Sequence, residues 1–273
     1  MKPQIEMVAL VAALMATPLI SASCDAAGSQ PDHIVMVVEE NHGFSDIIGN
    51  PNAPFINTLA SEGLLFTKFY GIGRPSQVNY FALFSGSTHG IVDNEAHTIS
   101  APTLADQLES AGLSFVGYGE AGAERKHKPW ESFVSSRHYA QDFNSFPKNF
   151  DQLPTVAFVT PNLSHNMHDG TIEEGDRWLR KHLEPYVNWA KRHNSLFILT
   201  FDEDDGHDDH RVPMIVVGAG IKPGMDDTLG DHYSLLRTIQ SSYGLASLTR
   251  SATAPLLAVV PAKSKPLEAL SAK

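Results

Sequence analysis

The sequence feature that most restricts the fold is an apolar run that stops abruptly at a cluster of acidic residues. Residues 196–201 have the sequence LFILTF, which is too continuous for a strand with one wet face and too short for a typical helix. Such a run predicts a strand buried on both faces, as in a parallel sheet. Residues 202–210 follow at once with the sequence DEDDGHDDH. Ligands of open parallel sheets bind beyond the carboxyl ends of the strands, so chemistry is expected at these acids.

Two interpretations of the acidic segment remain open at this point. Closely packed carboxylates repel one another, and a divalent cation would remove that repulsion. Acidic loops are also common at solvated surfaces, and the Asp-Asp-Gly sequence at residues 204–206 is ordinary turn chemistry. The segment by itself therefore predicts either a metal site or a surface loop.

Strand and helix patterns alternate along the rest of the chain. Besides 196–201, buried strands are expected at residues 33–38, 114–118, 155–159 and 213–217. Helices are expected at 54–62, 103–111 and 232–243, and a capping box at 171–174 opens a longer one. The alternation predicts an α/β fold with a mostly parallel sheet between two layers of helices, which is a three-layer α/β/α sandwich.

This topology brings distant polar residues together. Parallel strands have their carboxyl ends at one edge of the sheet, where three polar segments are therefore expected to meet. These are Glu40 and Asn41, residues 162–169, and Asp202 with Glu203. Their convergence favours the metal-site interpretation over the surface loop.

Charge and length restrict the class of protein. The 273 residues suffice for one large domain or two small ones, and the hydrophobic content of 42% is ample for a core. The formal net charge of −11 argues against nucleic acid as the main partner, because binding its backbone needs clustered Lys and Arg. A small phosphorylated substrate remains compatible with this charge if a metal or a few local cations offset its negative charge.

The two ends of the chain are expected to lie outside the main domain. Residues 7–20 are apolar but short for a bilayer span, and small residues follow them, so residues 1–23 are predicted to be a cleaved secretory signal. The protein is then exported, periplasmic or secreted, with no transmembrane segment after cleavage. Cys24 is the only cysteine, and a lipid anchor there is the less favoured alternative. Residues 31–248 form the predicted domain and 249–273 a peripheral tail.

Ser76 is the candidate nucleophile. It follows Pro75 where a short helix is expected to begin, and Gly86 follows that helix. A serine at this place is most often a helix N-cap. A helix N-terminus also suits an incoming phosphate, and a metal-bound hydroxyl there can attack phosphorus. Position alone favours the cap.

Six motifs in order resemble the bacterial phosphoesterase family of acid phosphatases and phospholipases C. They are VVEENHGFSDIIGNPNAPFINTLASEG, RPSQVNYFALFSGS, FVTPNLSHNMHDGTIEEGDRWL, LTFDEDDG, VPMIVVGAGIKPG and DHYSLLRTI. They extend from about residue 33 to 245. The chain is similar to the short secreted acid phosphatases of this family, such as the mycobacterial one, and the similarity includes the segment RKHKPW at residues 125–130.

This resemblance implies an alkaline-phosphatase-like fold and phosphoryl transfer through a covalent seryl phosphate. It implies Ser76 as the nucleophile and a set of histidines around the phosphate, namely His127, His168 and His232. The residues matching the metal-binding positions are Glu40, Asn41, Asp202 and Glu203. Their oxygen ligands favour one hard divalent ion, calcium, magnesium or manganese, over zinc.

Asn79 matches a position near the phosphate oxygens, but this chain departs from the family pattern close to it. Arg74 replaces a frequent histidine and is expected to add a phosphate contact, while Val78 replaces a frequent proline, so the loop presenting Asn79 is expected to be looser. Asn166 stands where the family commonly has an acid, which argues against a second metal.

The sequence therefore predicts an exported, metal-dependent acid phosphatase acting on phosphomonoesters. One alternative is a phospholipase C or a phosphoinositide phosphatase, whose substrate would be a phosphoinositide or a phospholipid head group. A second alternative, of a different class, is a non-catalytic periplasmic protein that binds a cation or a phosphate ester. It would need the same carboxylates but not Ser76.

Overall fold

The computed structural model describes residues 30–259. The predicted signal segment and Cys24 therefore lie outside the described residues, as does the last part of the predicted tail. The helices are α1 (Phe44–Ile47), α2 (Pro54–Glu62), α3 (Gln77–Ser85), α4 (Leu104–Ser110), α5 (Ile172–Ala190) and α6 (His232–Ser242). The strands are β1 (His33–Glu39), β2 (Leu64–Phe66), β3 (Phe69–Tyr70), β4 (Phe115–Gly119), β5 (Ala140–Asp142), β6 (Val156–Thr160), β7 (Ser195–Phe201), β8 (Met214–Gly218), β9 (Gly224–Asp226) and β10 (Gly230–Asp231).

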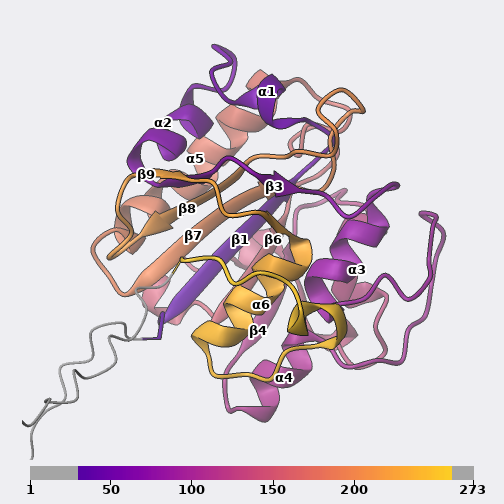
Figure 1. The fold of residues 1–273 in the computed structure, drawn as a ribbon. Coiled ribbons are helices and arrows are strands. Elements are labelled where there is room, and N and C mark those ends of the chain that lie inside the picture. The colour runs from indigo at the N-terminus through magenta and orange to yellow at the C-terminus, as the bar shows by residue number, and fades with distance from the viewer. Residues whose placement is uncertain (1–29, 260–273) are drawn as a thin grey trace, which may run out of the picture.

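The core of the molecule is an eight-stranded sheet in the order β5-β4-β6-β1-β7-β8-β2-β9. Helices α2 and α5 cover one face, and α3, α4 and α6 cover the other (Figure 1). The predicted three-layer α/β/α sandwich with a mostly parallel sheet is confirmed. Each strand predicted from an apolar run is present within a residue or two of its expected bounds, because these runs are buried on both faces.

The position of β1 in the sheet determines where the site forms. β1 pairs in parallel with β6 on one side and with β7 on the other. The carboxyl ends of all three strands therefore lie at one edge. There the backbone N–H of Asp202 donates to the carbonyl of Glu39 at 3.0 Å, and that of Glu40 donates to the carbonyl of Asn166 at 2.8 Å. The expected convergence of the three polar segments is thus present.

Strand β8 differs from a purely parallel arrangement. It pairs antiparallel with both β7 and β2. Gly218 at its carboxyl end therefore lies at the opposite edge of the sheet from Asp202. The buried run of residues 213–217 carries no information about strand direction, since a strand covered on both faces is apolar in either orientation.

Two further features concern the periphery. Residues 249–259, placed by the sequence analysis in a peripheral tail, pack on α6 in the structure: Ser251 and Leu257 are buried, and the backbone N–H of Leu257 donates to Oγ1 of Thr238 at 3.0 Å. Because the residues around Leu257 are mostly Ala, Pro and Ser, the sequence does not predict this contact. Within residues 30–259, no helix combines the length and apolar composition that a bilayer crossing needs.

Candidate active site

Ser76 occupies the N-cap position of α3, but its hydroxyl does not cap the helix. The side chain is buried, and its Oγ lies 3.0 Å from Oε2 of Glu40 and 3.2 Å from Oε1 of Glu203. A hydroxyl can donate its single proton to only one of these carboxylates at a time. The capping interpretation of Ser76 is therefore wrong for its side chain, which instead faces the acidic cluster.

Three buried carboxyl groups surround this hydroxyl. Burial raises the pKa of Glu40 to about 7, and burial together with the charges of Asp202 and Glu40 raises the pKa of Glu203 to about 8. Burial and the charge of Glu40 also raise the pKa of Asp202 well above its usual range. Among the residues that the structure describes, Oδ2 of Asp202 and Oε2 of Glu203 have no hydrogen-bond partner. The nearest cation to Oε2 of Glu203 is Nε of Arg74, at 3.9 Å, and the pKa of Glu203 stays raised despite its charge. The cluster therefore has too little positive charge for three carboxylates.

Asn41 contributes a further oxygen to the same place. Its backbone is left-handed, with a φ of 48°, which asparagine tolerates better than most residues. Its amide oxygen faces only acceptors, 3.3 Å from Oδ1 of Asp202 and 3.1 Å from Oε2 of Glu40. Either a cation lies among these oxygens, or the amide is turned so that its nitrogen donates to both carboxylates.

The oxygen atoms around Ser76 form a candidate ligand set for a metal ion. The oxygens of Glu40, Asn41, Asp202 and Glu203 are hard ligands, and two of them are buried without partners. Within residues 30–259, no three Asp, Glu, His or Cys side chains form a preassembled cluster for a metal ion. A cation would therefore complete its coordination with the amide oxygen and the hydroxyl in addition to carboxylates. The chemistry of the donors fits a hard ion such as calcium, magnesium or manganese.

Tyr80 and His127 both contact Glu40, Tyr80 through a hydrogen bond and His127 through a close approach without hydrogen-bond geometry. The Tyr80 hydroxyl donates a short hydrogen bond to Oε1 of Glu40, and Nε2 of His127 lies 3.2 Å from the same oxygen. The amide of Asn166 lies 3.2 Å from Nδ1 of His127, so the proton of a neutral imidazole is on the nitrogen that faces Glu40. Burial is the main reason that the pKa of His127 falls to about 3. Tyr80 was not predicted as a site residue. Its spacing of four residues from Ser76 on one helix nevertheless places both on the same face.

The other two predicted histidines have different surroundings. His168 is partly open to solvent, with 26% of its side chain exposed, and its Nδ1 lies 2.7 Å from Oδ1 of Asp169. His232 is buried at the start of α6, and its Nε2 lies 2.7 Å from the backbone carbonyl of Asp202. His168 is therefore the histidine that a substrate can reach, whereas His232 supports the backbone of a cluster residue.

Asn79 and Arg74 are both held by the protein. Oδ1 of Asn79 accepts hydrogen bonds from the backbone N–H groups of Ile72 and Gly73 at 2.7 and 3.3 Å, and its Nδ2 donates to the carbonyl of Gly73 at 2.7 Å. Nη2 of Arg74 donates a short bond to the Asp204 side chain and a second bond of 3.0 Å to its carbonyl. Asn79 therefore fastens the loop before Ser76, and the Asp204 contacts hold the Arg74 guanidinium beside the acidic loop.

The family model for phosphoesterases matches residues 50–246, which is most of the chain. The chain belongs to the phosphoesterase family. It is 41% identical over 240 residues to the phosphatidylinositol-3-phosphatase of Mycobacterium tuberculosis, covering 82% of this chain and 80% of that protein. It is 31% identical over 246 residues to an acid phosphatase of Aspergillus fumigatus, covering 77% of this chain and 54% of the longer fungal protein. This phosphoesterase is therefore a phosphoric ester hydrolase.

Solved structures agree with the fold. A protein of the alkaline phosphatase superfamily from Vibrio parahaemolyticus superposes with a TM-score of 0.62 at 17% identity, over 85% of this chain and 72% of that one. The lipoteichoic acid synthase LtaP from Listeria monocytogenes gives a TM-score of 0.64 at 10% identity, over 84% and 77% of the two chains. The predicted alkaline-phosphatase-like fold of this phosphoesterase is thus confirmed.

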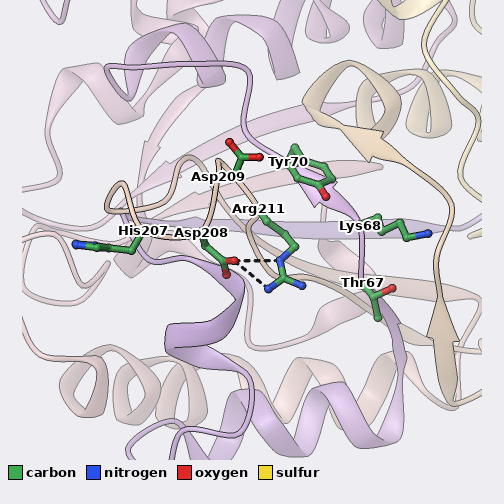
Figure 2. Close-up of a pocket in the computed structure, with 7 residues that line it drawn as sticks. All are labelled: Thr67, Lys68, Tyr70, His207, Asp208, Asp209 and Arg211. Atoms are coloured by element: carbon green, nitrogen blue, oxygen red, sulfur yellow. Dashed lines mark hydrogen bonds and ion pairs between the residues drawn. The ribbon is translucent and has the colours of Figure 1, made fainter.

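A pocket of about 500 Å³ lies beside the acidic loop of this phosphoesterase (Figure 2). None of the predicted site residues lines it; the lining residues are Thr67, Lys68, Tyr70, His207, Asp208, Asp209 and Arg211. Both of its cations are already paired, Lys68 with Asp227 at 3.1 Å and Arg211 with Asp208 at 2.9 Å. The pocket therefore offers little net positive charge to a phosphate, and the Ser76 cluster remains the candidate active site.

Proposed function

We propose that this phosphoesterase is an exported, metal-dependent acid phosphatase that hydrolyses phosphomonoesters through a phosphoryl group carried on Ser76. The observation that carries the proposal is the position of the Ser76 hydroxyl between two buried carboxyl groups, Glu40 and Glu203. A bare cluster of this kind is short of protons or of a cation, because like charges repel. Once a cation offsets the negative charge, the hydroxyl can give its proton to a neighbouring carboxylate and act as a nucleophile.

A calcium, magnesium or manganese ion held by Glu40, Asn41, Asp202 and Glu203 would lower the pKa of the Ser76 hydroxyl and shield the negative charge of the ester. Oδ2 of Asp202 and Oε2 of Glu203, which are buried without a hydrogen-bond partner among the described residues, support this ligand set.

The residues then have separate roles in two displacements. Oγ of Ser76 bonds to phosphorus as its O–H bond breaks, and a carboxylate of the cluster takes the proton. The bond from phosphorus to the alcohol oxygen breaks, and this oxygen takes a proton from His168, the histidine that solvent can reach. A water then attacks phosphorus and gives a proton back to His168. The bond from phosphorus to Oγ of Ser76 breaks, Oγ takes its proton back from the carboxylate, and inorganic phosphate is released.

The two buried histidines act through other residues in this scheme. The neutral imidazole of His127 directs Glu40 toward Ser76, and the ring of His232 holds the carbonyl of Asp202. Both are positioning residues, because each is fully buried and makes its contact within the protein.

A second candidate function is a phosphoinositide phosphatase. It is favoured by the relative that is named a phosphatidylinositol-3-phosphatase, since the match covers four-fifths of both chains. The two candidates share the chemistry at Ser76 and differ only in the alcohol that leaves.

The export proposal depends on the apolar segment of residues 7–20, which precedes the described part of the chain. The mass of the mature protein from its native host tests this proposal. Cleavage near residue 23 without added lipid supports a soluble exported protein, an added diacylglyceryl group at Cys24 supports the anchored form, and an uncleaved chain in the cytoplasm contradicts export.

The decisive experiment is hydrolysis of p-nitrophenyl phosphate from acidic to alkaline pH, before and after chelation and with a Ser76→Ala variant alongside. We expect turnover that chelation removes, that calcium, magnesium or manganese restores, and that the variant lacks. Phosphatidylinositol 3-phosphate in vesicles distinguishes the second candidate, and a phosphodiester substrate tests the phospholipase C alternative. No turnover of any ester would contradict the proposal and favour the non-catalytic binding protein.

A further inference from the structure

Lys126 belongs to a short turn that is fixed beside Ser76. The turn, Arg125–His127, is a single 3-10 segment. At its start, Arg125 donates to Oε1 of Gln77, the residue after Ser76, at 2.5 Å and to the carbonyl of Asn94 at 2.6 Å. At its end, the carbonyl of His127 accepts a bond of 3.1 Å from the hydroxyl of Thr160, the last residue of β6. The position of Lys126 is therefore determined from both sides.

The ammonium group of Lys126 contacts His168 directly. Its side chain is only 15% exposed, and its Nζ lies 3.2 Å from Nε2 of His168 and 3.4 Å from Oε2 of Glu124. Because a lysine ammonium can only donate, Nε2 of His168 is the acceptor in this contact. The proton of the imidazole is then on Nδ1, which faces Asp169 at 2.7 Å. In this arrangement His168 is neutral and Lys126 carries the positive charge.

This charge acts on the Ser76 cluster. Burial raises the pKa of Glu40, and the positive charge of Lys126 is one of the influences that act in the opposite direction, together with the hydrogen bonds from Tyr80 and Ser76. It also adds to the burial that lowers the pKa of His127. The geometry agrees: the ring of His168, which Lys126 contacts, lies 5.8 Å from the ring of His127, and Nε2 of His127 lies 3.2 Å from Glu40. The ammonium therefore lies next to the cluster, where it can attract a phosphate bound at Ser76.

Lys126 is more available to a ligand than the neighbouring cations. The guanidinium of Arg74 is engaged by Asp204, and that of Arg125 is engaged by Gln77 and Asn94. Lys126 by contrast has a neutral imidazole and a half-exposed carboxylate as its partners. A phosphate dianion is a stronger acceptor than the imidazole, so exchanging one for the other costs little.

We propose that Lys126 binds the phosphate group of the substrate, and that before binding the same ammonium group holds His168 in the neutral form with Nε2 unprotonated. The proposal rests on the proposed function, because it places the substrate phosphate at Ser76. On binding, Lys126 passes its hydrogen bond from His168 to a phosphate oxygen. Nε2 of His168 is then free to take a proton from solvent, and this is the proton that it gives to the leaving oxygen.

Three variants of the full mature protein test the proposal: Lys126→Met, Lys126→Arg and Lys128→Met. Lys128 is the matched control, because it lies two residues away, is 18% exposed and pairs with Glu131 at 2.8 Å. The measurements are kcat and KM for p-nitrophenyl phosphate and the inhibition constant of inorganic phosphate. A charge-assisted hydrogen bond is worth about tenfold to about a hundredfold in affinity. We therefore expect KM and the inhibition constant to rise by about that factor in Lys126→Met.

The Lys126→Arg variant should recover most of the phosphate affinity, and Lys128→Met should behave like the parent protein. An inhibition constant in Lys126→Met within about twofold of the parent value would overturn the proposal, while an active parent would leave the proposed function intact. If the parent is inactive on every ester, the proposed function fails separately, and phosphate affinity measured by calorimetry still compares the variants. Nitrogen NMR of His168 gives an independent readout: Nε2 should be unprotonated in the phosphate-free parent, and a proton on Nε2 there contradicts the second half of the proposal.

Discussion

The hydroxyl oxygen of Ser76 lies 3.0 Å from Oε2 of Glu40, across a separation of 36 residues in the chain. Glu40 directly follows β1 and Ser76 directly precedes α3, so the contact joins the central strand of the sheet to a helix of the layer above it. It forms because β1 ends at the edge toward which the N-terminus of α3 points.

The first prediction concerns Ser76. Replacing it with alanine removes the nucleophile, and we expect kcat for p-nitrophenyl phosphate to fall by about 10³-fold or more. The matched control is Ser85→Ala on the same helix, whose hydroxyl bonds to the carbonyl of Phe81 at 2.9 Å, away from the cluster. Acid quenching of the parent enzyme during turnover should trap phosphate on Ser76. Comparable rates in the Ser76→Ala variant and the parent would contradict the nucleophile assignment.

The second prediction concerns pH and stability without metal. Folding raises the pKa of Glu40 to about 7 and of Glu203 to about 8, from an ordinary value of 4.5. A carboxyl with a raised pKa stabilises the fold while protonated, so this stability is complete below the ordinary value and is lost as the pH rises through the folded values. The buried histidines His127 and His232 have lowered pKa values and act in the opposite sense up to their ordinary value of 6.5. The free energy of unfolding of the chelated protein should therefore fall between about pH 6.5 and about pH 8, where the raised carboxyl groups still titrate.

Urea unfolding at a series of pH values measures this fall, with Glu203→Gln as the comparison. The variant lacks one of the titrating groups, so its stability should depend less on pH in this window, and added divalent metal should flatten the curve of the parent protein. Asp204 and Asp208 have lowered pKa values and act in the opposite sense at more acidic pH, outside the window. If the free energy of unfolding of the chelated protein is level or rises across this window, the buried carboxyl groups around Ser76 do not have the raised pKa values described above.

The meeting of Glu40, Asp202 and Glu203 could be predicted from sequence, because it depends only on where buried parallel strands end. The direction of β8 could not, since its apolar run suits either orientation. The contribution of Tyr80 to the site could have been predicted from its helical spacing but was not. The place of Lys126 depends on how a short turn packs against Gln77 and Thr160, which no local pattern encodes.

The third prediction concerns Asn79, which family resemblance places near the phosphate oxygens. In the structure Asn79 lies on α3, and its side chain holds the loop before Ser76. Replacing it with alanine leaves the N–H groups of Ile72 and Gly73 without their acceptor, so we expect a loss of about 1–3 kcal/mol in the free energy of unfolding and lower kcat. Asn79→Asp keeps that acceptor and should retain more stability. Urea unfolding and phosphate inhibition separate the two roles: weaker phosphate binding at unchanged stability would indicate a direct phosphate contact instead.

The last prediction concerns Gly71, where the loop before Ser76 passes close to the backbone of Asp202 and Glu203. A Cβ at this position would lie 2.8 Å from the carbonyl oxygen of Asp202 and 3.4 Å from Cα of Glu203. The same carbonyl accepts the bond from His232, so a shift of the backbone would disturb both the cluster and its support. Gly71→Ala should therefore lower kcat and destabilise the fold by about 1–3 kcal/mol.

Gly224→Ala is the control for this substitution, because a Cβ at Gly224 meets no atom within 4 Å. Thermal unfolding and turnover of p-nitrophenyl phosphate should both be close to parental in this variant. If Gly71→Ala also has the activity and stability of the parent protein, the backbone of Asp202 can shift without moving its carboxyl group. The close approach of the loop would then not be what aligns Ser76 with Glu203.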